Sequence, residues 1–182
     1  AIAHAVEGFY VQDANPVTSL MAEEGIRAFA DGLRRLVRNP QDIDARSDCL
    51  YGACLCGSVF GTVGGALHHK LCHTLGGTWN LPHAETHTVV LPHATAYNAS
   101  AAPDAMARIA RALGAANAAQ GLYDLAQSLG APVALKDIGM PGGDLDRAAD
   151  LAVTSPYWNP RPIERAAIRK LLDDAWNGRR PA

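Results

Sequence analysis

Apolar residues recur at helical spacing along most of the chain, and prolines, asparagines and glycines mark where the runs begin and end. Asn15 and Pro16 form a helix-start signal, and the apolar positions that follow recur every three or four residues until Asn39. Three later runs each stop at a glycine: 106–113 before Gly114, 122–129 before Gly130, and 168–176 before Gly178. Because only residues 88–91 could be argued as a strand, the pattern predicts an all-α helical bundle.

Residues 42–65 differ from these runs, because they are rich in small residues and carry few charges after Asp48. Each glycine there lowers intrinsic helicity by roughly 1 kcal/mol relative to alanine, so a helix requires close tertiary packing. The sequence predicts a buried central helix over this segment. The Gly-rich stretch at Gly61 follows no recognisable strand, which argues against a nucleotide-binding loop. Loops are expected at 139–144 and 154–162.

Composition and charge then narrow the class of protein. A length of 182 residues suits a single domain, 1–182, and a net charge of −2 gives no basic face for a nucleic acid or an anionic membrane. No apolar run reaches the roughly 20 residues that span a bilayer, so we expect a soluble, cytoplasmic protein. The cysteines lack paired CxxC spacing and predict reduced, buried thiols; they are Cys49, Cys54, Cys56 and Cys72.

Histidines concentrate in one short stretch, since five of the seven fall within residues 66–87. His69 and His73 are four apart and would share one face of a helix. The Gly-Gly step and the proline that follow would let His83 return to the same point, and His4 could be brought in by folding. Imidazole favours Zn(II), Fe(II), Cu(II) or Ni(II), and a catalytic centre keeps three protein ligands and an open position.

The residues alone leave a second interpretation open. HxxxH is an unspecific spacing, and His83 with His87 repeats it, so these side chains could instead cap helices or form hydrogen bonds in the core. His93 follows a second Leu-Pro step and is expected to start a helix or to pack. Cys72 is expected to be a small buried residue.

Four stretches carry a resemblance to a known family: "AIAHAVEGFY", "LHHKLCHTLGG", "LPHAETHTVVLPHATAYN" and "NPRPIERAAIRKLLDDAWNG". Together they resemble the C-terminal helical domain of the iron-containing alcohol dehydrogenase superfamily, most closely its maleylacetate reductase branch. The resemblance implies a homodimeric two-domain enzyme, of which this chain is a fragment, with an upstream α/β domain that binds NADH or NADPH. The activity it implies is reduction of maleylacetate, a small dicarboxylate, to 3-oxoadipate in the degradation of aromatic and chloroaromatic compounds.

The resemblance also implies roles for individual residues. The metal-ligand histidines of the family would fall on His4, His69 and His83, and the histidine beside the substrate on His73, which we expect to donate the proton. A divalent metal, Fe or Zn, remains open. Metal-dependent members carry an aspartate four residues before the first ligand, a position just before Ala1, where the reductase branch often has an asparagine that would weaken metal binding.

Substrate contacts are expected around these histidines. The resemblance marks His68 and Lys70 as characteristic of the reductase branch, although their helix positions point away from His69 and a solvated Lys70 is the simpler expectation. His87 could lie at the rim of the site. In the Pro-rich loop, Tyr157 could donate a proton or bind a carboxylate, and Arg161 could bind one, or the loop could simply seal the core.

Two other functions stay open at this point. An Fe(II)- or Zn(II)-dependent alcohol dehydrogenase would use the same three ligands, and an aspartate just before Ala1 would favour it. A non-catalytic helical module that binds a metal or a partner protein would not need a nucleotide. Nucleotide binding by the whole protein separates this last class from the enzymes.

Overall fold

The signals at the helix ends act as the sequence predicts. Asn15 caps its helix, because its side-chain oxygen accepts hydrogen bonds from Val17 N at 3.1 Å and Thr18 N at 3.0 Å. Thr18 Oγ1 in turn accepts from Asn15 N at 3.2 Å, which completes a capping box. At the other ends, the chain turns through left-handed glycines: Gly114 with φ 66°, Gly130 with φ 70° and Gly178 with φ 67°.

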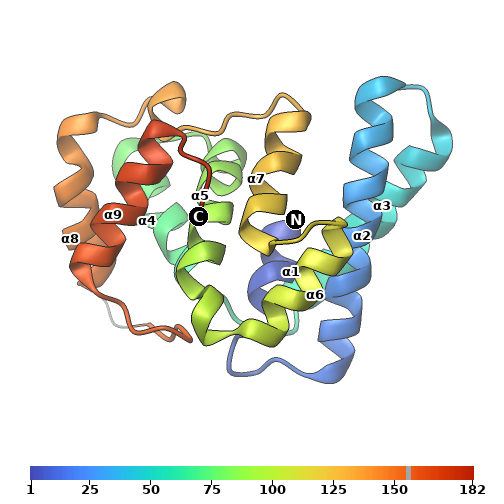
Figure 1. Cartoon of the computed structure of the whole chain (residues 1–182), viewed down its shortest axis with the longest axis horizontal. Helices are drawn as coiled ribbons and strands as arrows, with labels where there is room; N and C mark the ends of the chain where they lie inside the picture. The colour runs from blue at the N-terminus through green and yellow to red at the C-terminus, as the bar shows by residue number, and fades with distance from the viewer. Residues whose placement is uncertain (155–156) are drawn as a thin grey trace.

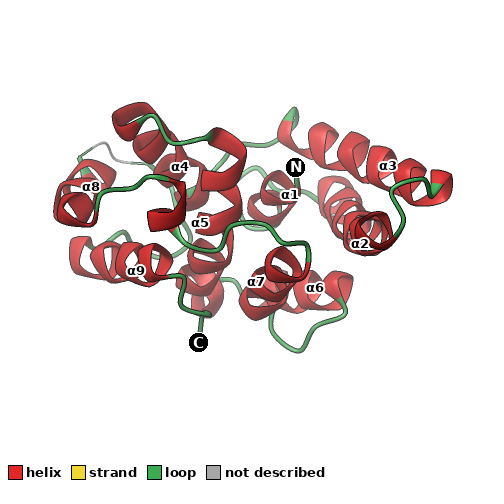
Figure 2. Cartoon of the chain, turned by 90° about the horizontal axis from the view of Figure 1, so that it is seen from above, coloured by secondary structure: helices red, strands yellow, loops and turns green. Residues whose placement is uncertain are grey.

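The computed structural model describes residues 1–154 and 157–182, and these residues form helices and loops without a strand. The all-α prediction is therefore confirmed (Figure 2). The α-helices are α1 (Ile2–Gly8), α2 (Pro16–Arg38), α3 (Ile43–Phe60), α4 (Leu67–Trp79), α5 (His83–Asn98), α6 (Pro103–Leu113), α7 (Ala118–Ser128), α8 (Leu145–Val153) and α9 (Arg165–Asn177). Short 3-10 turns follow α5 and precede α8; they are η1 (Ala99–Ala101), η2 (Leu135–Ile138) and η3 (Gly142–Asp144). In the described part of the chain, no helix combines the length and apolar character needed to cross a membrane.

Two apolar cores lie on either side of α5. The α2–α3 hairpin stands at one end of the molecule and the α8–α9 pair at the other (Figure 1). One core is built from α1, α2, α3, α6 and α7, and the other from α4, α5, α8 and α9. Helix α5 serves both, since Leu91 packs in the first core and Val90 and Tyr97 pack in the second. The histidines come from α1, α4 and α5, the helices that meet between the two cores.

The segment 42–65 does form a helix over most of its length, α3, but the prediction that this helix is buried and central is wrong. Helix α3 lies at the edge of the bundle, where Leu50 is 73% exposed and Tyr51 48% exposed. Its glycines serve close packing on one side only: a Cβ on Gly52 would lie 2.9 Å from Phe29 Cδ2 and 3.1 Å from the Gly25 carbonyl oxygen. The helix buried on most sides is α5, in which the residues from 89 to 95 are all buried.

Other expectations are met in part. All four cysteines are free thiols, but Cys54 is exposed and Cys49 half-buried, so the prediction of buried thiols holds only for Cys56 and Cys72. The loop expected at 139–144 includes η3, and the loop expected at 154–162 is non-helical where described, while its residues 155–156 lie outside the described residues. His93 packs inside α5, 4% exposed, and does not start a helix.

Candidate functional site

Six of the seven histidines meet where α1, α4 and α5 converge. The ring of His69 on α4 is stacked on that of His4 on α1, with centroids 4.9 Å apart, and lies edge-on to that of His87 on α5 at 5.3 Å. The ring of His83 lies 4.1 Å from that of His87, and the ring of His73 lies 6.2 Å from that of His69. Folding thus brings together imidazoles from three helices that are far apart in the sequence.

The turn between α4 and α5 produces this convergence. His69 and His73 lie one helical turn apart on α4, and His83 and His87 lie one turn apart at the start of α5. The expected Gly-Gly break is not where α4 ends, because the helix continues through both glycines to Trp79. Asn80 ends it instead, in the left-handed region with φ 51°, which asparagine tolerates better than most residues. The prediction of a proline at the start of the next helix is confirmed, since Pro82 is the N-cap of α5.

A buried carboxylate lies behind the cluster. The side chain of Glu7, on α1, is fully buried, and its Oε2 accepts hydrogen bonds from Ala66 N at 2.7 Å and from His69 Nδ1 at 2.6 Å. Its Oε1 accepts a hydrogen bond from His68 N at 2.7 Å. Burial opposes ionisation, but the hydrogen bonds from His69 and from the backbone N–H of Ala66 hold the pKa of Glu7 below its ordinary value.

Sequence analysis missed Glu7, although one signal for it was present. Glu7 follows His4 by three residues, so the two side chains share a face of α1. A carboxylate on the face that carries a buried histidine needs a partner, because an unpaired buried charge is strongly disfavoured. The partner, however, is 62 residues further along the chain, which only the fold reveals.

His68 is fully buried between its neighbours, with its ring centroid 5.0 Å from that of His69 and 4.9 Å from that of His87. Its Nε2 lies 3.0 Å from the His87 carbonyl oxygen, which can only accept, so we assign the ring proton to Nε2. Burial lowers the pKa of His68 to about 4. The structure therefore places His68 inside the cluster, uncharged, and not along the wall of the cavity described next.

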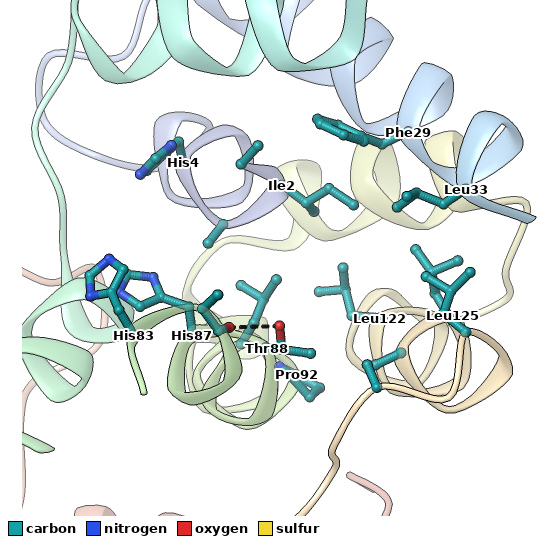
Figure 3. Close-up of a pocket in the computed structure, with 17 residues that line it drawn as sticks. Ile2, His4, Phe29, Leu33, His83, His87, Thr88, Pro92, Leu122 and Leu125 are labelled. Carbon is teal, nitrogen blue, oxygen red and sulfur yellow. Dashed lines mark hydrogen bonds between the residues drawn. The ribbon is translucent and has the colours of Figure 1, made fainter. Parts of the chain in front are cut away.

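A cavity of about 400 Å³ opens beside the histidines. His4, His83 and His87 line one end of it, and apolar side chains line the rest (Figure 3). The apolar lining comes from α1, α2, α5 and α7; it includes Ile2, Phe29, Leu33, Leu122 and Leu125. An apolar cavity with a few converging polar groups is the usual form of a small-molecule site.

Two of the imidazoles at this end of the cavity, His4 and His87, are largely uncharged at neutral pH. Burial, followed by repulsion from neighbouring cations, lowers the pKa of His4 to about 4 and that of His87 to about 3. Burial also lowers the pKa of His73, although this side chain is exposed. Neutral imidazoles have electron pairs available for a proton or a metal ion.

The donor set suits a transition metal. One ligand nitrogen each from His68, His69 and His87 lies within 4.8 Å of the others. Among the described residues, each of these three side chains also has one buried ring nitrogen without a hydrogen-bond partner. All-imidazole sites suit zinc and iron. The predicted trio of ligands shares only His69 with this group, and the structure brings its other two members, His4 and His83, to the same end of the cavity.

The remaining candidates lie in or against the loop before α9. Lys70 is half-buried, and its Nζ lies 5.6 Å from the centroid of the Tyr157 ring. The Tyr157 hydroxyl is buried without a hydrogen-bond partner among the described residues, and burial raises its pKa. Arg161 is engaged elsewhere: it donates to the Tyr97 carbonyl oxygen at 3.0 Å, and its guanidinium lies 4.1 Å from the centroid of the Tyr97 ring. The loop therefore brings Tyr157 towards α4, while Arg161 packs on Tyr97 of α5.

Asn159 links this loop to the start of α4. Its Oδ1 accepts from Leu67 N at 3.3 Å and from Asn98 Nδ2 at 3.0 Å. Its amide nitrogen donates back to Asn98 Oδ1 at 2.7 Å. The first backbone N–H groups of α4 have no acceptor within the helix, and Glu7 and Asn159 together accept hydrogen bonds from them. Both residues therefore hold the helix that carries the histidine cluster.

Comparisons with known proteins agree with this geometry. Residues 1–176 match the C-terminal family model of the Fe-containing alcohol dehydrogenase family. The whole chain is 61% identical to a maleylacetate reductase of Burkholderia cepacia and covers 52% of that protein. The solved structure of maleylacetate reductase from Rhizobium sp. strain MTP-10005 superposes with a TM-score of 0.96 and 53% identity, over 99% of this chain and 51% of the other.

A second solved structure is that of an iron-containing alcohol dehydrogenase from Corynebacterium glutamicum, with a TM-score of 0.93 and 44% identity, over 100% of this chain and 51% of the other. The chain spans about half the length of the curated relatives it matches. The family model covers the α1 histidine, the α4–α5 cluster and the described helices from α1 to all but the last residue of α9. From its sequence and fold, the chain belongs to the Fe-containing alcohol dehydrogenase family, of which it matches the C-terminal part.

Proposed function

We propose that the protein containing this chain is a maleylacetate reductase, which reduces maleylacetate to 3-oxoadipate with NADH or NADPH. The observation that carries the proposal is the histidine cluster at the end of an apolar cavity, in a chain 61% identical to a protein of that name. This chain would supply the histidine side of the substrate site. The family resemblance alone supports a cytoplasmic homodimer.

The reaction asks three things of the protein: to orient the substrate, to stabilise the charge that develops, and to deliver a proton. NADH or NADPH supplies a hydride to the carbon–carbon double bond conjugated with the substrate ketone, and the product forms when a proton is added to the resulting enolate. We assign the proton to His73, which is exposed one helical turn beyond His69. The substrate carboxylates would be bound by Lys70, Tyr157 and Arg161, and by His87 through its ring N–H group. His68 was a candidate for the same role, but its ring N–H donates to the His87 carbonyl oxygen, so His68 would support His87 instead.

A metal ion would be held by His4, His69 and His83 if this protein follows the metal-dependent members of the family. It would polarise the substrate oxygen and so stabilise negative charge there. The geometry offers His68 and His87 as competing donors close to His69. Without a metal, His4 and His83 would stabilise the enolate oxygen by hydrogen bonds or positive charge.

A second candidate function is a metal-dependent alcohol dehydrogenase. The all-imidazole donor set and the similarity to the Corynebacterium glutamicum iron-containing alcohol dehydrogenase favour it. The identity of 44% to that protein is lower than the 61% to the Burkholderia cepacia reductase, which is why we rank it second.

The test is turnover by the whole protein. Oxidation of NADH or NADPH would be followed with maleylacetate, before and after treatment with a chelator, and NAD(P)⁺ reduction would be followed with short alcohols. We expect reduced cofactor to be consumed with maleylacetate, and loss of that turnover on chelation would assign a metal. Turnover with alcohols alone would favour the second candidate. Failure to bind nucleotide at all would leave a non-catalytic helical module.

A further inference from the structure

We propose that Glu7 is a positioning residue, which holds the ring proton of His69 on Nδ1 and thereby makes Nε2 of His69 an electron-pair donor within the histidine cluster. Glu7 lies on α1, does not line the cavity and acts only through α4. The consequence for catalysis rests on the proposed function, whereas the position of the proton can be measured without any turnover.

The hydrogen bonds around Glu7 leave little choice about the proton of His69. Oε2 of Glu7 accepts from Ala66 N at 2.7 Å, and Oε1 accepts from His68 N at 2.7 Å. Backbone N–H groups can only donate, so both oxygens accept, and because the pKa of Glu7 is held below its ordinary value, the ionised carboxylate has no proton of its own to donate. The third group at this carboxylate is Nδ1 of His69, 2.6 Å from Oε2, and it must therefore be the N–H that donates.

The other nitrogen of the ring is then defined. In a neutral imidazole with its proton on Nδ1, Nε2 carries the lone pair. Nε2 of His69 is buried and has no hydrogen-bond partner among the described residues. Its ring is stacked on His4 and lies edge-on to His68 and His87. His69 thus points an electron pair into the cluster, which can bind a metal ion or take up a proton but cannot donate a hydrogen bond to a substrate oxygen.

The same carboxylate also fixes the ring in space. The side chain of Glu7 is fully buried and bonded to the first turn of α4 at three points, so His69 cannot rotate without breaking its bond to a group that is itself immobile. A carboxylate behind a histidine is a common means of setting both the tautomer and the orientation of the ring. A purely structural role, as a cap for α4, would leave the tautomer of His69 free.

The experiment is nitrogen NMR of the whole protein labelled with 15N-histidine, freed of metal by a chelator and recorded at mildly alkaline pH. Long-range proton–nitrogen correlation distinguishes a protonated ring nitrogen from one with a lone pair. Signals are assigned with His69→Gln. We expect a protonated Nδ1 and an unprotonated Nε2 for His69. A proton on Nε2, with or without one on Nδ1, would overturn the proposal, and this result needs no variant of Glu7.

The matched pair of variants is Glu7→Ala and Asn159→Ala, because both residues bind backbone N–H groups at the start of α4 but only Glu7 contacts His69. In E7A we expect the Nε2-protonated form of His69 to appear and kcat with maleylacetate to fall roughly 10- to 100-fold, with KM little changed. In N159A, His69 should keep the wild-type tautomer, whatever the loss of the bonds from Asn159 to α4 and to the loop before α9 does to kcat. Equal effects of the two variants on the tautomer would contradict the proposal, and loss of E7A turnover with an unchanged tautomer would reduce Glu7 to a structural cap.

The proposed function and the inference about Glu7 can be refuted independently of each other. If wild-type protein shows the expected tautomer but does not reduce maleylacetate, the proposed function fails and the role of Glu7 towards His69 stands. If it reduces maleylacetate while His69 carries its proton on Nε2, the inference about Glu7 fails and the function stands.

Discussion

His93 should make the folded protein sensitive to mild acid. It is buried in α5, only 4% exposed, and burial lowers its pKa from 6.5 to about 4. The charged groups of α9 that face it, Asp174 and Lys170, act in opposite directions. The folded protein therefore keeps His93 neutral, while the unfolded chain takes up a proton as the pH falls below 6.5. Stability contributed by this site is lost between pH 6.5 and about pH 4.

The magnitude follows from that shift. At pH 5 the unfolded chain binds most of a proton at this site and the folded protein binds little, which lowers the free energy of unfolding by about 2 kcal/mol relative to pH 7.5. Replacing His93 with leucine removes the uptake of this proton. The other histidines with lowered pKa values are present in both proteins, so their contributions cancel in the comparison; they are His4, His68, His73 and His87.

Urea unfolding of the wild type and of His93→Leu at pH 7.5 and pH 5, followed by tryptophan fluorescence, measures this difference. We expect the wild type to lose about 2 kcal/mol more than the variant between the two pH values. His93→Asn is the matched control, because asparagine packs differently from leucine but also cannot take up a proton in this pH range. The free energy of unfolding of this variant should show the same reduced pH dependence as that of the leucine variant. Equal losses in wild type and variants would refute the reasoning.

Three further predictions concern packing and catalysis. Gly52→Ala should lower the free energy of unfolding by about 1–3 kcal/mol because its Cβ would overlap Phe29, whereas Gly57→Ala on the same helix, with open space around it, should raise stability by up to about 1 kcal/mol; both are measured by urea unfolding. Arg161→Ala should cost about 1–2 kcal/mol through its contacts with Tyr97, and an unchanged KM for maleylacetate would reject its role in substrate binding. His73→Asn should lower kcat about 100- to 10,000-fold with a smaller change in KM, and retention of wild-type kcat would remove His73 as the proton donor.

The helical architecture could be predicted because its signals are local. Asn15 caps α2 and glycines end other helices through left-handed conformations, and both effects depend on a few neighbouring residues. The position of a helix in the bundle is not local. The glycines of α3 indicate close packing but not how many sides are packed, and α3 proves to pack closely against α2 while its far side remains exposed.

The sequence could predict which histidines form the cluster, but not the hydrogen bonds that hold them in place. Spacing and resemblance point to the cluster histidines, and the structure brings His4, His69, His73 and His83 to one place. What holds them there was beyond the sequence, because Glu7 contacts His69 across 62 residues and Asn159 contacts Leu67 across 92 residues. Such partners have no fixed spacing, so only the fold identifies them.

The most direct test of the central claim is a crystal structure of the whole protein with bound 3-oxoadipate, the proposed product. The account predicts that the ligand lies at the histidine end of the cavity, with its atoms within hydrogen-bond distance of His73 and of at least one of His4, His83 and His87. The account would be contradicted by a ligand bound at full occupancy elsewhere in the protein, with these imidazoles in contact only with solvent.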